Sequence, residues 1–248
     1  MTDFSYQLYS SRNFQPLEAT LAMVAKAGYA SVEGYGGLYD DAAALATLLK
    51  AHHLSMKTGH FGLAVLEHEV SHALTVATTL GMERIYCPHL MPDDRPTTAD
   101  GWREFGAHLQ KVGKPYRDAG FGFGWHNHDF EFVALADGSI PQDLIFEGGP
   151  DLEWEADIAW IIRGGAEPLD WISRYGDRIT AVHVKDIAPS GQNSDEDGWA
   201  DVGHGKVDWA GLMAELMGTK CSNFVMEHDN PSDHTRFATR SIASAKGY

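Results

Sequence analysis

The segment ITAVHVKDI, residues 179–187, is an apolar, strand-like run that carries two basic side chains, His183 and Lys185. Side chains along a strand point to opposite faces in turn, so these two residues face away from Val182 and Val184. In a strand of a closed parallel barrel, this pattern places His183 and Lys185 in the lumen. The alternative for His183 is a hydrogen-bonded core histidine.

Three other apolar runs also end in polar residues, namely FGWHNHDFEF (123–132), LEWEADIAW (152–160) and NFVMEHDNP (223–231). Each carries a side chain that can bind a metal near its predicted strand end: His126, Asp157 and Glu227. A parallel β/α barrel builds its active site from several strands that each deliver one residue to the same rim. Two histidines, an aspartate and a glutamate suit Mn²⁺, Zn²⁺, Fe²⁺ or Co²⁺ better than Ca²⁺.

Strand-like and helix-like segments alternate along the whole chain. The predicted strands cover 5–9, 30–33, 55–59, 84–88, 122–127, 152–156, 181–185 and 223–227. The predicted helices cover 17–27, 41–52, 66–80, 99–119, 142–148, 168–175 and 208–216, with a last one after 232. Eight βα units predict an α/β fold, a (β/α)₈ TIM barrel that forms a single domain over residues 1–248. A dinucleotide-binding fold would need glycines directly after the first strand, and residues 10–13 contain none.

Composition narrows the classes of partner. The 248 residues are 44% hydrophobic and carry a net charge of −16, which disfavours nucleic acid and anionic membranes. No apolar run is long enough to span a bilayer, and residues 1–14 contain no basic segment followed by an apolar one, so we expect no signal peptide. Cys87 and Cys221 are expected to be free thiols, which favours a reducing compartment. We therefore expect a cytoplasmic protein that acts on a small molecule.

Some site residues have competing interpretations. Asp157 is either a metal ligand or the N-cap of the segment 158–162. His126 and His128 share one strand face, so one can bind metal while the other contacts substrate or a carboxylate. Glu227 follows three apolar residues, and a buried carboxylate needs a partner such as a cation.

Further candidates lie near the other predicted strand ends. Glu33 is a candidate acid or base, or else part of a salt bridge at the rim. Glu131 could reach a sugar hydroxyl or the metal, and His60 could line the pocket. Trp160 is either a pocket wall or a packing residue. The glycine-rich turn at 203–205 precedes a predicted helix, where a small anion could dock.

The chain resembles the sugar phosphate isomerase/epimerase group of xylose isomerase-like TIM barrels. The motifs YQLYSSR, VEGYG, HNHDFEF, EADIAW, HVKD, GHGKVDW and MEHD carry this resemblance, in this order and spacing, over nearly the whole chain. It implies one divalent metal, most often Mn²⁺, with Zn²⁺, Co²⁺, Fe²⁺ or Mg²⁺ as alternatives. Asp157, His183 and Glu227 match three ligand positions, and His126 stands where the epimerases usually have a glutamate. Homodimers or homotetramers are common in this group.

The chemistry implied by the resemblance is abstraction of a proton next to the carbonyl of a small sugar or keto-sugar. Glu227 or His126 would act as the base, while Lys185, Glu33 or Glu131 would orient hydroxyls or protonate a leaving oxygen. His126 in place of the second carboxylate makes a metal-dependent lyase or dehydratase the main rival to an isomerase or epimerase. A nucleic-acid enzyme resembling AP endonucleases would need a basic surface, and a sugar-binding barrel without catalysis is the remaining alternative.

Overall fold

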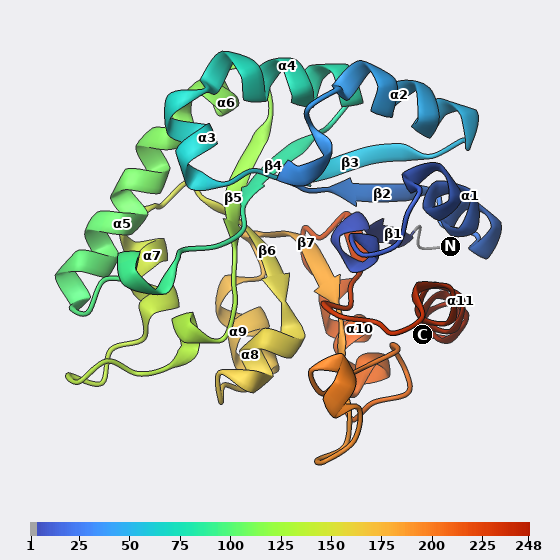
Figure 1. The fold of residues 1–248 in the computed structure, drawn as a ribbon. Coiled ribbons are helices and arrows are strands. Elements are labelled where there is room, and N and C mark those ends of the chain that lie inside the picture. The colour runs from blue at the N-terminus through green and yellow to red at the C-terminus, as the bar shows by residue number, and fades with distance from the viewer. Residues whose placement is uncertain (1–3) are drawn as a thin grey trace.

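Eight parallel strands form a closed barrel in the computed structural model, which describes residues 4–248 (Figure 1). The strands are β1 (Phe4–Gln7), β2 (Ser31–Gly34), β3 (Ser55–His60), β4 (Arg84–Cys87), β5 (Gly122–His126), β6 (Glu153–Asp157), β7 (Ile179–Val184) and β10 (Asn223–Met226). The first strand, β1, pairs with both β2 and β10, which closes the sheet. The predicted (β/α)₈ TIM barrel is confirmed, and each strand begins and ends within two residues of its predicted range.

The helices form a ring around the barrel (Figure 1). They are α1 (Leu17–Ala27), α2 (Ala42–Ala51), α3 (Leu63–His68), α4 (Val70–Leu80), α5 (Ala99–Val112), α6 (Lys114–Asp118), α7 (Pro141–Gly148), α8 (Ile158–Arg163), α9 (Pro168–Tyr175), α10 (Trp209–Leu216) and α11 (His234–Ala245). The first and last of them, α1 and α11, lie side by side. No helix in residues 4–248 is both long and apolar enough to cross a bilayer.

Two predicted helices are each divided in the structure. The predicted helix 66–80 is α3 followed by α4, and the chain leaves helical geometry at Glu69, where φ is −125°. The predicted helix 99–119 is α5 followed by α6, with the break at Gly113. Pro115 lies in the first turn of α6, where a missing N–H costs little, so the helix breaks just before this proline.

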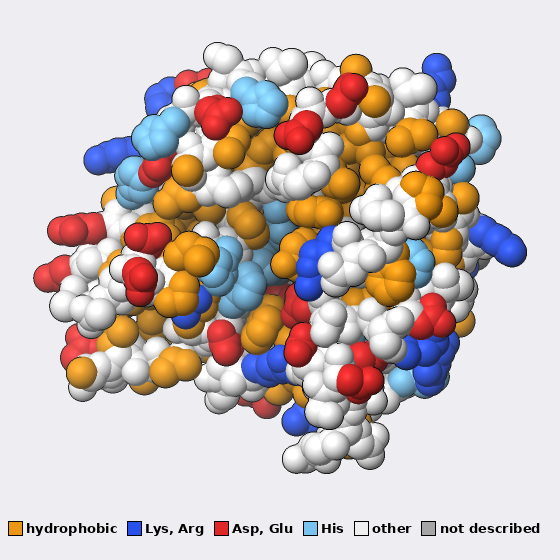
Figure 2. Space-filling view, viewed as in Figure 1, with side chains coloured by type: hydrophobic (Ala, Val, Ile, Leu, Met, Phe, Trp, Pro, Cys, Tyr) orange, Lys and Arg blue, Asp and Glu red, His pale blue; other side chains and the backbone are white. Residues whose placement is uncertain are grey.

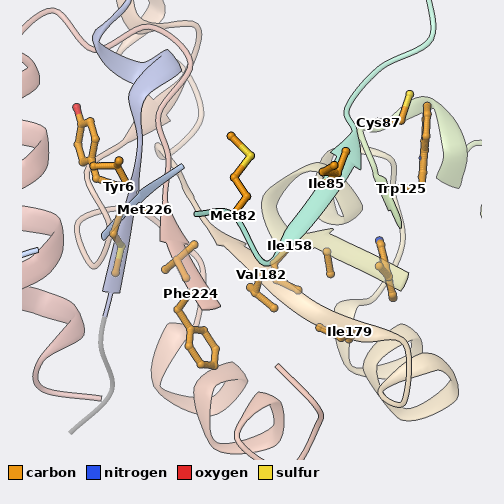
Figure 3. Packing of buried hydrophobic residues seen from close by; sticks show 14 of the residues in the cluster. Tyr6, Met82, Ile85, Cys87, Trp125, Ile158, Ile179, Val182, Phe224 and Met226 are labelled. Atoms are coloured by element: carbon orange, nitrogen blue, oxygen red, sulfur yellow. The ribbon is translucent and has the colours of Figure 1, made fainter. Parts of the chain in front are cut away.

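The apolar core lies between the outer face of the barrel and the helices (Figure 3). Tyr6 of β1 and Met226 of β10 are paired in register and fully buried. Val182 and Ile85 are also fully buried, and complete burial of such a side chain contributes about 1.5–3 kcal/mol. The outward face of each strand therefore holds the fold together, which leaves the inward face free to carry polar groups.

A short hairpin lies between β7 and α10, where no strand was predicted. The strands β8 (Asp186–Ile187) and β9 (Trp199–Ala200) pair antiparallel, with a 3₁₀ turn at Ser194–Glu196 between them. Arg236 of α11 donates to both carboxylate oxygens of Glu196, each at 2.8 Å. This ion pair ties the hairpin to the last helix, so the segment is folded and anchored.

Gly106→Ala should lower the free energy of unfolding by about 2–3 kcal/mol. A Cβ at Gly106 of α5 would lie 2.2 Å from the carbonyl oxygen of Ile145 in α7, so the two helices would have to move apart. Urea denaturation measures the effect. Gly62→Ala is the matched control, since Gly62 has φ −61° and no atom within 4 Å of an added Cβ. An unchanged midpoint for Gly106→Ala would show that the helix contact is loose.

Candidate active site

A cavity of about 460 Å³ opens at the carboxyl ends of the strands. Its lining includes His60, His126, His128, Trp160 and Glu227, so the structure brings together predicted residues from four different segments. Histidine side chains gather around the hollow in the middle of the face shown in Figure 2. Parallel β/α barrels carry their active sites at this end, which makes the cavity the candidate active site.

Three of the four predicted metal ligands converge beside this cavity. Potential ligand atoms of Asp157, His183 and Glu227 all lie within 4.8 Å of one another, and we call these residues the Asp157 group. The Nδ1 atom of His183 is 2.9 Å from Glu227 Oε2 and 3.8 Å from Asp157 Oδ2. All three side chains are buried.

Asp157 is the N-cap of α8, and its second carboxylate oxygen stays available for a cation. Its Oδ1 accepts a hydrogen bond from the backbone N–H of Trp160 at 2.9 Å, which makes it the N-cap of α8. Its Oδ2 is buried without a hydrogen-bond partner in residues 4–248. Asn127 holds the end of β6 in place, because its Oδ1 accepts from the backbone N–H of Asp157 at 3.0 Å. Burial raises the pKa of Asp157 to about 7, against the opposing effect of Lys185.

Glu33 lies under His183, away from the cavity lining. Its Oε1 accepts from Gln7 at 2.7 Å and lies 2.7 Å from His183 Nε2, while Thr58 donates to Oε2. Burial opposes ionisation of Glu33, but His60 and His183 together lower its pKa to about 2. Both oxygens of the ionised Glu33 carboxylate already accept hydrogen bonds, and one of these bonds orients His183. The geometry therefore favours a positioning role for Glu33 over the predicted role as acid or base. Carboxylates that accept from a ligand histidine in this way fix its orientation and tautomer.

The predicted four-residue set is incomplete, because His126 lies with different partners. Potential ligand atoms of His126 group with those of His60, Glu155 and His183 rather than with the Asp157 group. His126 Nδ1 is 3.2 Å from Glu155 Oε2. Burial and the neighbouring His183 hold the pKa of His126 well below its usual range, so the imidazole is neutral. A neutral imidazole is competent both as a ligand and as a base.

Sequence reasoning missed Glu155 as a site residue. Glu155 is fully buried and lies two residues before Asp157, on the same face of β6. The alternation of side chains along a strand could therefore have identified Glu155 as a site residue. Its Oε2 lies 2.5 Å from His60 Nε2. The pairing register between β6 and β7 shifts between Trp154 and Glu155, an irregularity of the kind that re-aims side chains near active sites. Burial and the nearby Glu33 raise the pKa of Glu155 to about 8.

Lys185 is fully buried and faces the Asp157 group. Its Nζ donates to Asp229 Oδ2 at 2.5 Å and to Glu227 Oε2 at 3.2 Å, and it lies 4.1 Å from the centre of the Trp199 ring. Burial alone would lower the pKa of Lys185, but Asp229 and Glu227 outweigh it and raise the pKa. Lys185 therefore stays charged beside Glu227, as expected from its inward position in the strand pattern.

Glu131 does not line the cavity. Its Oε1 accepts from Trp125 Nε1 and its Oε2 from the backbone N–H of His128, both at 3.0 Å. Burial raises its pKa to about 8. Glu131 shapes the turn after β5, so its geometry does not support the predicted contact with substrate or metal.

The glycine-rich turn at 203–205 already holds an anionic group from the protein itself. Asp186 Oδ2 accepts from the backbone N–H groups of Gly203 at 2.9 Å and Gly205 at 3.0 Å. Its Oδ1 accepts from Ile187 at 2.8 Å and Val207 at 3.1 Å. The predicted docking of an external anion at this turn is therefore wrong, because the carboxylate of Asp186 takes its donors.

Asp186→Asn should destabilise the fold by about 2 kcal/mol. The amide nitrogen would face N–H donors, and each buried donor left without an acceptor costs about 1–3 kcal/mol. Thermal unfolding measures the loss. Asp208→Asn is the matched control, because Asp208 caps α10 through a single bond to Gly211 N, and asparagine caps equally well. Equal melting temperatures for the two variants would contradict the anchoring role of Asp186.

The donor atoms of the site fit a divalent cation. Asp157 Oδ2 and His126 Nδ1 are buried and unpartnered within residues 4–248, although most buried polar atoms in proteins are paired. The donors are imidazole nitrogens and carboxylate oxygens, which suit first-row divalent metals. Lys185 hydrogen-bonds Glu227 and Asp229 and leaves Asp157 Oδ2 without a hydrogen bond, and a cation bound there would satisfy this oxygen.

Comparisons with known proteins agree with this architecture. A sugar phosphate isomerase/epimerase from Parabacteroides distasonis superposes with a TM-score of 0.83 at 18% identity, over 98% of this chain and 92% of that one. A zinc-bound IolI protein superposes with a TM-score of 0.73 at 16% identity, over 99% and 96%. At such identities these structures show a shared fold.

An inosose dehydratase of Lacticaseibacillus casei is 27% identical over 106 residues, which is 42% of this chain. The match spans only 35% of the length of that relative. The model of one protein family, described as xylose isomerase-like TIM barrel, matches residues 21–245. That range includes β2–β10 and every member of the Asp157 group. The chain belongs to the xylose isomerase-like TIM barrel family.

Proposed function

We propose that the protein is a divalent-metal-dependent isomerase or epimerase that acts on a small sugar or keto-sugar. The observation that carries this proposal is the convergence of Asp157, His183 and Glu227 beside a cavity large enough for a sugar. Membership of a family whose relatives include sugar isomerases and dehydratases supports it.

Asp157, His183 and Glu227 would hold the metal. When bound, the cation would polarise the substrate carbonyl and offset the negative charge that develops on its oxygen. Mn²⁺ is our first choice, and the zinc in the related IolI structure supports Zn²⁺ as the alternative. Glu33 would keep His183 Nδ1 directed at the site by accepting from Nε2.

Glu227 is the base that this geometry supports best. Its Oε2 accepts from Lys185 and lies within hydrogen-bond distance of His183 Nδ1, which leaves Oε1 to take the substrate proton. Burial works against its ionisation, but Lys185 and His183 hold the pKa of Glu227 well below its usual range, so it is ionised at neutral pH. Lys185 would orient a substrate oxygen, while His60, His128 and Trp160 would form the walls around the sugar.

A lyase or dehydratase on the same scaffold is the second candidate. The observation that favours it is the neutral His126, which stands where a second carboxylate would complete a pair of acid–base residues. After the same proton abstraction, loss of a neighbouring hydroxyl or alkoxyl group would replace return of the proton to the other face. The partial likeness to inosose dehydratase supports this alternative.

Exchange of substrate hydrogen with solvent deuterium separates the candidates. Protein loaded with Mn²⁺ is incubated with a panel of keto-sugars in D₂O, and the products are analysed by mass and NMR spectroscopy. Deuterium in a recovered epimer or isomer is expected for the first candidate, and loss of water or an alcohol for the second. Treatment with a chelator should stop both reactions. Metal-loaded protein that exchanges no hydrogen with any of these sugars would end both proposals.

A further inference from the structure

A second group of metal-ligand side chains lies in the lumen next to the Asp157 group. Potential ligand atoms of His60, His126, Glu155 and His183 lie within 4.8 Å of one another. All four side chains are buried, and the most exposed of them, His60, retains 8% of its surface. They come from β3, β5, β6 and β7, so only closure of the barrel brings them together.

The separations within this group match those of ligands around one ion. Divalent metals bind nitrogen and oxygen at roughly 2.0–2.2 Å, so neighbouring ligands of one ion lie roughly 3 Å apart. Glu155 Oε2 is 3.2 Å from His126 Nδ1 and 2.5 Å from His60 Nε2. The contact with His60 would lengthen when an ion replaces the proton that His60 shares with Glu155.

Two buried atoms of this group have no hydrogen-bond partner in residues 4–248. His126 Nδ1 and Glu155 Oε1 make no hydrogen bond in the part of the chain that the structure describes. Both side chains are almost fully buried, at 2% and 0% exposure, so bulk water cannot satisfy these atoms. Unpaired buried donors and acceptors are unfavourable, and a cation would satisfy both at once.

Acidic side chains crowd the lumen around the second group. Glu33, Glu155, Asp157 and Glu227 are all buried there, and Lys185 contacts Glu227 and Asp229 rather than Glu155. Among the described residues, the ion-pair contacts of Glu155 are with His60, His126 and His183. A divalent ion held between Glu155 and these histidines would compensate the buried carboxylate.

His183 cannot be a metal ligand in both groups at once. Its Nε2 lies 2.7 Å from Glu33 Oε1, to which it donates, so the neutral imidazole offers only Nδ1 as a ligand, and Nδ1 faces the Asp157 group. The second group therefore has three ligands of its own: His60, His126 and Glu155. Two histidines and one carboxylate with further positions open are a recurring set for Zn²⁺ and Fe²⁺.

We propose that His60, His126 and Glu155 form a second divalent-cation site, separate from the Asp157 group. Its larger share of nitrogen ligands makes it the more selective of the two for Zn²⁺ or Co²⁺ over Mn²⁺. The site is independent of which reaction the protein catalyses, because the inference rests on ligands and charge alone.

The test counts bound ions. Full-length protein stripped with a chelator is titrated with Co²⁺, the visible absorption bands are followed, and cobalt per chain is measured by mass spectrometry after desalting. The wild type should hold two ions, and Glu155→Gln and His60→Ala should each hold one. Glu153→Gln is the matched control: Glu153 lies on the same strand but bonds Arg84 and Thr180, so it should retain two ions.

Several outcomes would overturn the second site. These are a wild type that binds a single ion, or two ions retained by both Glu155→Gln and His60→Ala. Circular dichroism checks folding, and His60→Gln replaces any variant that misfolds. Asp157→Asn separates this proposal from the proposed function, because it should lose an ion while the Glu155 ion stays. A wild type whose single ion is lost in Glu155→Gln and kept in Asp157→Asn would overturn the assignment of the Asp157 group as well.

Discussion

Glu227→Ala should lose one bound metal ion per chain and reduce turnover by about 10³-fold or more, while the barrel stays folded. The variant removes a ligand of the Asp157 group and the proposed base together. Loss of one preorganised group that stabilises developing charge already costs about 10²–10³-fold in other enzymes. The fold should persist because the apolar core lies on the other face of the strands. Metal analysis and initial rates on the same preparation measure both effects.

Asp229→Asn is the matched control for Glu227→Ala. Asp229 follows Glu227 by two residues, lines the same cavity and also accepts from Lys185, but it belongs to neither group of ligand atoms. The Asp229→Asn variant should retain its full metal content. Full metal content in Glu227→Ala would remove Glu227 from the ligand set, and unchanged turnover would remove it as the base. His183→Ala should reproduce the metal loss of Glu227→Ala.

His126→Glu should keep its metal and change the reaction. The variant restores a carboxylate at the position where the epimerases of this family usually have one, so a second group could return the proton as a carboxylic acid. If the wild type is a lyase, the variant should release less water or alcohol and should yield a deuterated epimer in D₂O. If the wild type is an epimerase that uses His126, the variant should retain epimerisation with a shifted pH profile.

His128→Asn is the control for His126→Glu. His128 follows His126 by two residues and lines the cavity, but its side chain belongs to neither ligand group. The His128→Asn variant should raise KM and leave the ratio of products unchanged. An unchanged product ratio for His126→Glu, with metal bound, would show that residue 126 has no part in moving the proton.

The sequence by itself determined the eight barrel strands, the alternation of strands and helices, and the level of the site. Gly28 and Gly81 directly follow the predicted helices 17–27 and 66–80, and both have positive φ, at 100° and 69°. The alternation in ITAVHVKDI predicted that His183 and Lys185 share an inward face, and both are buried against carboxylates. These features depend on local backbone geometry, which neighbouring residues encode, so they can be read without the tertiary structure.

Only the tertiary structure decided which polar side chains meet. Glu33 and His183 are 150 residues apart, and His60 and Glu155 are 95 apart, yet each pair is in contact across the lumen. Strand periodicity places a residue on one face of the sheet. Barrel closure and the register shifts beside Glu33 and Glu155 set the level of each side chain along the barrel axis. For this reason the sequence located the rim of the site, while the partner of His126 and the positioning role of Glu33 emerged only from the folded barrel.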